Sequence, residues 1–341
     1  MSEPQYIAVI GASAGGLNCV IELCAQLKPE MHMSVFVVMH LNSPSVAKLL
    51  LQRIQRTSSY TCAEAHDGHP IHSQHIYMVT EDKHLVIKKN KILLGKGPTE
   101  NRSRPSIDIL FRSAAVAYGS KTFGIILSGM LQDGTAGMSA IQRSGGTLIV
   151  QDPREAVYPD MPQSVIDNVG FDYCVQLHQM GDILSEKTKI GNPPHLIPIE
   201  VRAEAEIAER AAIGINNVSP LGEKSLFYCP DCGGGLWEMN EDDYPRYRCH
   251  TGHVYSEKEL LFKQNQSLEN TLWVALRMME ERRNLLKIMS DEEFSKGWLK
   301  SAHLKQEREM ELTDHIERLK GILFDARDLG AEAISKVNRQ A

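Results

Sequence analysis

Continuous apolar segments alternate with helical segments over residues 5–190, and this alternation constrains the fold more than any other feature. The segments YIAVI (residues 6–10), SVFVVMH (34–40) and TFGIILSG (122–129) are apolar almost throughout, as expected for strands that are buried on both faces. Amphipathic segments such as LNCVIELCAQL (17–27) separate them. The alternation predicts an α/β fold, a doubly wound and mostly parallel sheet with helices on both faces.

Composition and charge exclude several classes of protein. A formal net charge of −6 with no long basic stretch argues against a nucleic-acid-binding protein. No apolar stretch approaches the roughly 20 residues that a membrane-spanning helix needs, so we expect no membrane insertion. The polar start MSEPQ leads directly into a strand-like segment and has none of the features of a signal peptide. We therefore expect a cytoplasmic protein.

The first predicted strand ends in the glycine-rich turn GASAGG at residues 11–16. A dinucleotide-binding turn has the pattern G-x-G-x-x-G, whereas this turn has Ser13 where the second glycine belongs, and the Gly-Lys-Ser/Thr of a phosphate loop is missing. The other interpretation is that the turn presents Ser13 as a nucleophile. In that case Ala14, Gly15 and Gly16 leave room for a substrate, and the following helix offers free N–H groups to an oxyanion.

A serine nucleophile needs a base and a group that orients the base. His40 ends the second apolar segment, and Asp133 follows the third, in ILSGMLQDGTAG. The carboxyl ends of parallel strands meet at one edge of a sheet, where open α/β folds bind their ligands. The sequence therefore predicts a Ser-His-Asp set formed by Ser13, His40 and Asp133 at that edge.

A second cluster of chemically active residues lies in FYCPDCGGGLWE and YRCHTGHVYS. Cys229 and Cys232 form a C-x-x-C knuckle, and Cys249 and His253 follow with a spacing typical of a zinc ribbon. His250 is a rival fourth ligand, but its adjacency to Cys249 would strain a tetrahedral site. Four protein ligands leave no open position, so we expect one structural Zn²⁺ per chain and no cofactor for catalysis.

Two other groups of residues receive a simpler interpretation. His66, His69, His72 and His75 crowd one polar segment, whose Gly and Pro prevent a single helical face, so we expect a solvated loop. The cysteines outside the second cluster stand singly, as do buried and unreactive thiols.

Residues 6–185 resemble the catalytic domain of CheB-type protein-glutamate methylesterases. The family's motifs are found here as GASAGG, VVMHLNSPS and GMLQDG, and as the longer blocks RPSIDILFRSAA and VQDPREAVYPDMPQSVI. The resemblance implies Ser13 as nucleophile, His40 as general base and Asp133 as the group that orients His40. It also implies that the backbone N–H of Met130 donates to the oxyanion.

The resemblance extends to substrate-binding residues and carries two departures. Arg104 or Arg112 would contact carboxylates of the substrate, although Arg112 fits equally well on a helix surface. Many family members have threonine after the nucleophile and glycine after the oxyanion methionine, where this chain has Ala14 and Leu131. These departures concern rate and substrate preference, not the class of reaction.

The family's common form carries an N-terminal receiver domain, and residues 1–5 leave no room for one. We expect four parts: a catalytic domain at residues 1–190, a linker with a short helix at 191–225, a zinc-ribbon-like module at 226–256 and a helical tail at 257–341. An apolar stripe on the tail predicts either a helical hairpin packed on itself or a surface for a homodimer or a partner helix; its members are Leu312, Ile316, Leu319 and Leu323.

The expected function is hydrolysis of glutamyl methyl esters in a methylated chemoreceptor or a similar signalling protein. Deamidation of glutamine is implied more weakly by the same resemblance. The alternative is a non-catalytic adaptor, in which the hydrolase domain is a binding platform and the ribbon and helices recruit partners.

Overall fold

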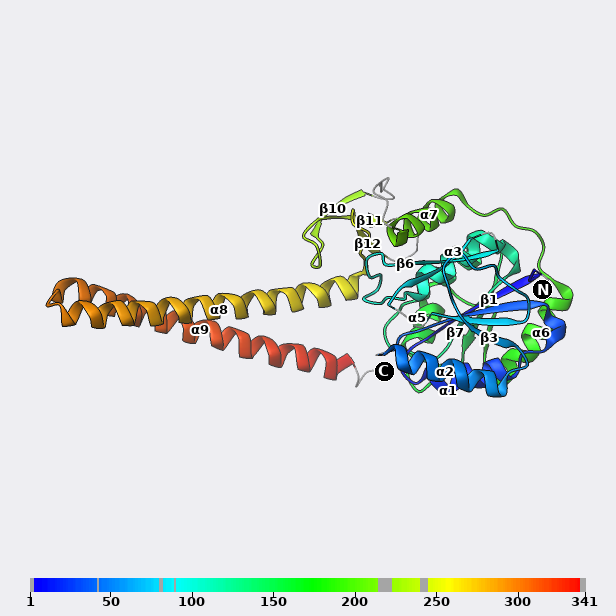
Figure 1. Cartoon of the computed structure of the whole chain (residues 1–341), viewed down its shortest axis with the longest axis horizontal. Helices are drawn as coiled ribbons and strands as arrows, with labels where there is room; N and C mark the ends of the chain where they lie inside the picture. The colour runs from blue at the N-terminus through cyan, green and yellow to red at the C-terminus, as the bar shows by residue number, and fades with distance from the viewer. Residues whose placement is uncertain are drawn as a thin grey trace. The chain divides into compact units, whose positions relative to one another are not determined.

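The computed structural model describes residues 3–41, 43–79, 82–88, 90–213, 223–239 and 245–337 (Figure 1). The chain divides into two compact units, Met1–Glu259 and Leu260–Ala341. The first unit contains the main sheet, its helices and the Cys/His cluster, and the second is helical. The four-part division predicted from the sequence is finer than this and stays a prediction.

Seven strands form the main sheet in the order β3-β4-β2-β1-β7-β8-β9, and every neighbouring pair is parallel. Their bounds are β1 (Tyr6–Ala12), β2 (Met33–Met39), β3 (Thr61–Glu64), β4 (His75–Met78), β7 (Thr122–Ile126), β8 (Thr147–Gln151) and β9 (Tyr173–Val175). The predicted parallel α/β fold is confirmed. The short strands β3 and β9 at the two sheet edges had no long apolar segment to mark them in the sequence.

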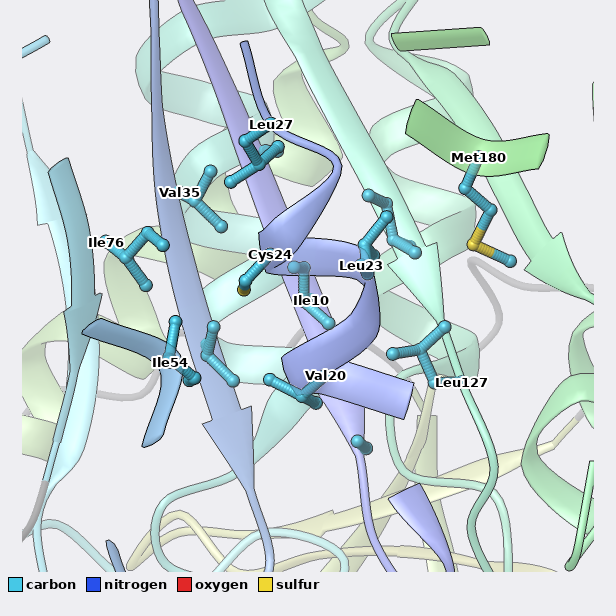
Figure 2. Packing of buried hydrophobic residues seen from close by; sticks show 14 of the residues in the cluster. Ile10, Val20, Leu23, Cys24, Leu27, Val35, Ile54, Ile76, Leu127 and Met180 are labelled. Atoms are coloured by element: carbon cyan, nitrogen blue, oxygen red, sulfur yellow. The ribbon is translucent and has the colours of Figure 1, made fainter. Parts of the chain in front are cut away.

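Helices cover both faces of this sheet. Alternate residues of a strand point to opposite faces, so Ala8 and Ile10 of β1 join one core and Ile7 and Val9 join the other. The first core packs against α1 (Gly16–Ala25), α2 (Pro44–Thr57) and α6 (Met180–Ile190), and part of it is drawn in Figure 2. The second packs against α3 (Ile107–Tyr118), α4 (Thr135–Arg143) and α5 (Asp160–Asn168).

Strand β1 has β2 on one side and β7 on the other, so the strand order reverses at its carboxyl end. Such a switch point is where open α/β sheets form a crevice for ligands. The segments that follow β1, β2 and β7 hold the three residues of the predicted triad.

The remaining elements of the main domain lie outside the main sheet and the six helices that cover it. Strands β5 (His84–Lys88) and β6 (Lys91–Gly95) form the expected antiparallel hairpin, and short 3-10 helices span Pro29–Met31, Gly119–Lys121 and Leu177–Gln179. Helix α7 (Ile199–Ile213) packs on α3. The segment before α7 is tied to the domain, because the Asn192 side-chain amide donates to the Thr147 hydroxyl at 2.8 Å.

The Cys/His segment forms its own four-stranded antiparallel sheet in chain order. Its strands are β10 (Glu223–Tyr228), β11 (Gly235–Met239), β12 (Arg246–Cys249) and β13 (Val254–Ser256). We call this sheet, with the turns between its strands, the Cys/His module.

The second unit is a helical hairpin of α8 (Glu257–Ser295) and α9 (Leu299–Val337). The apolar stripe predicted on α9 packs against Leu272, Leu276 and Met279 of α8. The stripe is therefore covered within this chain, as the hairpin interpretation expects, and it gives no support to a dimer or partner surface. Among the described helices, none is long and apolar enough to cross a membrane.

Candidate functional site

Ser13 and His40 lie side by side at the carboxyl edge of the main sheet. They directly follow Ala12 and Met39, which are paired in the ladder between β1 and β2. The backbone N–H of His40 donates to the Ala12 carbonyl at 3.2 Å, and the N–H of Ser13 donates to the Ser128 carbonyl at 3.0 Å. Because both residues leave buried, hydrogen-bonded strands, their backbones are held in place.

Asp133 meets His40 from the segment between β7 and α4. His40 Nε2 lies 2.8 Å from Asp133 Oδ2, and the Asp133 side chain is only 3% exposed. The other ring nitrogen, Nδ1, is left for Ser13. No hydrogen bond joins the Ser13 hydroxyl to the His40 ring in the described part of the chain; such bonds are often long before a substrate binds.

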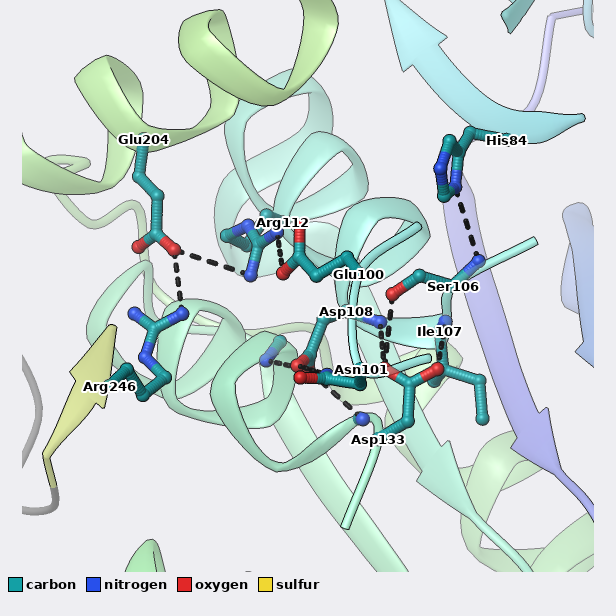
Figure 3. A network of polar contacts seen from close by, with 12 residues as sticks. His84, Glu100, Asn101, Ser106, Ile107, Asp108, Arg112, Asp133, Glu204 and Arg246 are labelled. Atoms are coloured by element: carbon teal, nitrogen blue, oxygen red, sulfur yellow. Dashed lines mark hydrogen bonds and ion pairs between the residues drawn. The ribbon is translucent and has the colours of Figure 1, made fainter. Parts of the chain in front are cut away.

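The carboxylate of Asp133 is also the anion at the N-terminus of α3. Its oxygens accept from the backbone N–H groups of Ile107 at 2.8 Å and Asp108 at 3.1 Å, and from the Ser106 hydroxyl at 3.0 Å (Figure 3). The first N–H groups of a helix have no partner within the helix and favour a negative charge. Asp133 therefore caps the N-terminus of α3 from a distant part of the sequence.

Asn101 is the fourth of the donors, apart from His40, that surround the Asp133 carboxylate; we call these donors the shell of Asp133. Its side-chain nitrogen donates to Asp133 Oδ1 at 2.9 Å and to Asp108 Oδ2 at 2.6 Å. Burial would raise the pKa of Asp133, but the hydrogen bond and charge of His40, with the donors from Asn101 and Ile107, hold that pKa below its usual value. The carboxylate is therefore ionised and oriented toward His40.

The segment Ser128–Met130 packs directly against the predicted nucleophile. A Cβ on Gly129 would lie 2.1 Å from the Met161 sulfur and 3.0 Å from Ser13 Cβ, so this approach requires glycine. Among the described residues, the backbone N–H of Met130 has no acceptor. An oxyanion donor needs a free N–H beside the nucleophile. The oxyanion role of Met130 stays a prediction.

The glycine turn after Ser13 is packed rather than open. Gly15 has a φ of 73°, and a Cβ there would lie 2.8 Å from the Ser128 hydroxyl. That hydroxyl donates to the Ala14 carbonyl at 2.9 Å and accepts from the Tyr158 N–H at 3.0 Å. These contacts give Gly15 a packing role, and contact of Ala14, Gly15 and Gly16 with substrate stays a prediction.

The two arginines considered for substrate binding have partners of their own. Arg104 donates to both carboxylate oxygens of Asp82, at 2.8 and 2.6 Å, and to the Gly97 carbonyl at 2.7 Å. Arg112 is fully buried and paired with Glu100 and Glu204. Neither role considered for Arg112, a substrate contact or a helix surface, is correct. A substrate contact of Arg104 stays a prediction.

The candidate metal site in the Cys/His module brings four possible ligand atoms close together. The Cys232 and Cys249 sulfurs are 3.7 Å apart, and His253 Nδ1 lies 3.4 Å from Cys249 and 3.6 Å from Cys229. Zn–S and Zn–N bonds of about 2.3 and 2.0 Å would separate such ligands by about 3.5 to 3.8 Å. The four ligand atoms lie within 4.8 Å of one another.

His250, the rival ligand, lies outside this group of four. Its ring sits over the knuckle, where a Cβ on Gly234 would be 2.4 Å away. Of the four histidines expected in a solvated loop, His75 is instead the first residue of β4 and pairs with Thr61. Their rings form two pairs, His66 with His69 and His72 with His75. In the described ranges these four do not form a cluster of three or more groups within metal-binding reach.

Sequence reasoning missed Asn101, Ser106 and the N-terminus of α3 as the surroundings of Asp133. The pattern RPSID does mark a helix start. Which carboxylate faces that start depends on the packing of α3 against α4, and this contact is distant in the sequence.

Comparison with known proteins identifies the family to which the chain belongs. The family model described as CheB methylesterase matches residues 8–184. The protein-glutamate methylesterase/protein-glutamine glutaminase of Thermotoga maritima is 34% identical over 184 residues, which cover 53% of this chain and 53% of that protein. A Leptospira interrogans protein whose name pairs the same two activities is 32% identical over 176 residues, covering 51% of this chain and 91% of that relative.

A solved structure of similar fold belongs to the same family. The crystal structure of the Thermotoga maritima CheB methylesterase catalytic domain is 33% identical with a TM-score of 0.51, covering 55% of this chain and 99% of that one. The chain thus spans about half the length of relatives such as the full-length Thermotoga maritima protein. Since the family model matches more than half of its 341 residues, the chain belongs to the CheB methylesterase family.

Proposed function

We propose that this protein is a serine hydrolase that demethylates glutamyl methyl esters of a chemoreceptor-type signalling protein. The observation that carries the proposal is the 2.8 Å contact between His40 and the buried Asp133, at the strand ends beside Ser13. The names of the relatives supply the substrate class, a protein glutamate methyl ester, and a second activity, deamidation of protein glutamine.

In the proposed mechanism Ser13 Oγ attacks the ester carbonyl while His40 Nδ1 takes its proton. Asp133 holds the ring through Nε2 and stabilises the imidazolium that forms. The N–H of Met130 stabilises the negative oxygen of the tetrahedral intermediate. The intermediate collapses, His40 returns the proton to the leaving methoxide, and methanol departs.

Hydrolysis of the acyl-enzyme repeats these steps with water. His40 takes a proton from water, the resulting hydroxide attacks the acyl carbon, and the Ser13 oxygen leaves with the proton from His40. The product is a glutamate carboxylate. A glutamine side chain would follow the same route, with ammonia as the leaving group.

We also propose that Cys229, Cys232, Cys249 and His253 hold a structural zinc ion. The spacing of the ligand atoms supports this, and so does the donor set of three thiols and one imidazole. The thiolate is the form that binds zinc. The proposed site needs its cysteines as thiols, and thiols persist in a reducing compartment such as the cytoplasm. We therefore place the protein there.

The test of the proposed function is Ser13→Ala. The wild-type protein should release methanol from a methyl-esterified receptor segment, and the variant should lose this activity by several orders of magnitude because the triad acts as a unit. Ser267→Ala, a partly exposed serine on α8, is the matched control and should keep full activity.

A fluorophosphonate probe gives an independent readout, since it forms a covalent bond with an activated serine. It should label Ser13 in the wild-type chain and leave Ser13→Ala unlabelled. A wild-type chain that neither releases methanol nor reacts with the probe would favour the alternative function, a non-catalytic adaptor.

A further inference from the structure

The Cys/His module is joined to the main domain by backbone pairing next to the candidate active site. Val254 of β13 forms a parallel bridge with Glu100. The backbone N–H of Asn101 donates to the Val254 carbonyl at 3.3 Å. The module therefore contacts the two residues that lead into the shell around Asp133.

A buried cluster of charges fixes the same junction (Figure 3). Arg246 of β12 pairs with Glu204 of α7 at 2.8 Å, and Arg112 of α3 contacts Glu204 at 3.3 Å and also pairs with Glu100. All four side chains are at most 5% exposed. Removing one partner of a buried ion pair leaves an uncompensated charge, so the module, α7 and α3 hold one another in place.

Asn101 links this junction to Asp133 through a side-chain hydrogen bond. An amide nitrogen has two hydrogens, and those of Asn101 are both used, one on Asp133 and one on Asp108. The residue is only 7% exposed, and its backbone has a φ of 49°, a left-handed conformation that asparagine tolerates. The contacts with Val254 and two hydrogen bonds between Glu100 and Ser103 hold the backbone at residues 100–101. From this position the Asn101 side chain reaches both carboxylates.

We propose that Asn101 is a positioning residue for the triad acid, and that the Cys/His module is a required part of the active-site framework because it holds Asn101. This rests on the proposed function of Asp133. It assigns the module a role toward catalysis in the same chain, separate from recruitment of a partner.

The first test is Asn101→Ala in the full chain. Asn101 is buried and its side chain contacts Asp133 and Asp108, so kcat should fall about 10- to 100-fold while KM changes by less than about twofold. The downfield proton resonance of the His40–Asp133 hydrogen bond should shift or broaden. Asn90→Ala is the matched control, because Asn90 is also left-handed, with a φ of 63°, and lies in the turn between β5 and β6.

The second test removes the metal from the wild-type chain with a chelator and follows deuterium exchange. The amide of Asn101 should lose protection as the β13 contact loosens, kcat should fall in parallel, and added Zn²⁺ should restore both. This measurement does not depend on the folding of a variant, and exchange at Asn101 is read without any activity.

The outcomes separate the two proposals. A wild-type chain without esterase activity defeats the proposed function. An active wild type whose Asn101→Ala variant keeps its kcat and its His–Asp proton resonance overturns the role of Asn101. Full kcat in metal-free protein with an unprotected Asn101 amide overturns the role of the module.

Discussion

Asp133 shows how one residue acquires a role that its local sequence does not display. It lies in a turn between β7 and α4, and aspartate is common in such turns. Here it lies against the first turn of α3, where four donors in addition to His40 bind its two oxygens. These donors make it both the cap of a helix and the candidate orienting acid.

Glu259 is a second buried acid at the residue scale. Its carboxylate accepts from the backbone N–H and the hydroxyl of Ser256, at 3.1 and 3.0 Å, and its own N–H donates to that hydroxyl at 3.3 Å. This reciprocal pair is a capping box at the start of α8. Burial, with a smaller contribution from the charge of Asp133, raises the pKa of Glu259 to about 7.

The raised pKa predicts a pH-dependent cost of folding. The folded chain binds a proton at Glu259 more tightly than the unfolded chain does, so its stability falls as pH rises from about 4.5 to about 7. Glu259→Gln keeps the capping box and removes the charge. Its advantage in unfolding free energy over the wild type should grow by on the order of 2 kcal/mol between pH 5 and pH 8.

Thermal or urea unfolding at a series of pH values measures this difference. Glu257→Gln, at an exposed acid in the same helical turn, is the control and should follow the wild-type curve. Parallel curves for Glu259→Gln and the wild type would contradict the prediction.

At the element scale, the Cys/His module brings two local motifs together. The Cys229/Cys232 knuckle lies between β10 and β11, and the Cys249/His253 turn lies between β12 and β13. The antiparallel pairing of Leu236 with Cys249 sets one motif opposite the other. A four-stranded sheet this small has little apolar core, so we expect the metal to supply much of its stability.

This arrangement predicts which substitutions release the metal. Elemental analysis should find about one zinc per wild-type chain, and none when Cys232→Ser or His253→Ala removes a ligand. The amides of the Cys/His module should then lose protection while the seven-stranded sheet stays folded. His250→Ala should keep the metal; loss of zinc in that variant with retention in His253→Ala would reverse the assignment.

The helical hairpin shows what the apolar stripe on α9 packs against. The stripe on α9 was open to two interpretations because a heptad-like pattern does not identify its partner. In the structure Ile316 is fully buried and Leu323 is 2% exposed, both against α8. A homodimer or a partner helix on this tail stays a prediction.

At the scale of the whole molecule, the main domain, α7 and the Cys/His module share the compact unit Met1–Glu259. The expected boundary of a catalytic domain at residue 190 stays a prediction. The triad candidates, the shell of Asp133 and the charge cluster all belong to that unit.

Two truncations test this boundary. A chain that ends at residue 265 keeps the whole unit and should retain kcat on a small methyl ester within about twofold. A chain that ends at residue 190 loses Glu204 and Arg246 and leaves Arg112 with Glu100 alone. Loss of a partner from a buried ion pair costs about 3 to 5 kcal/mol.

We therefore expect the shorter chain to melt at a clearly lower temperature and to lose most of its activity. Circular dichroism on heating and methanol release measure the two effects. A stable, fully active chain of residues 1–190 would show that α7 and the Cys/His module are dispensable for the fold and the chemistry.

The sequence by itself determined the features that depend on short segments. Buried parallel strands need continuous apolar runs, so the central strands and their carboxyl ends are visible in the sequence, and with them Ser13, His40 and Asp133 as residues of one sheet edge. The candidate ligands Cys229, Cys232, Cys249 and His253 are likewise visible, because each pair belongs to one local turn.

Only the tertiary structure decided the features that depend on distant contacts. It placed Asp133 at the N-terminus of α3 and buried Arg112 among Glu100 and Glu204. In each case several polar residues were locally acceptable, and burial selected among them. A buried charge or donor is stable only next to its complement, and the fold determines where that complement lies.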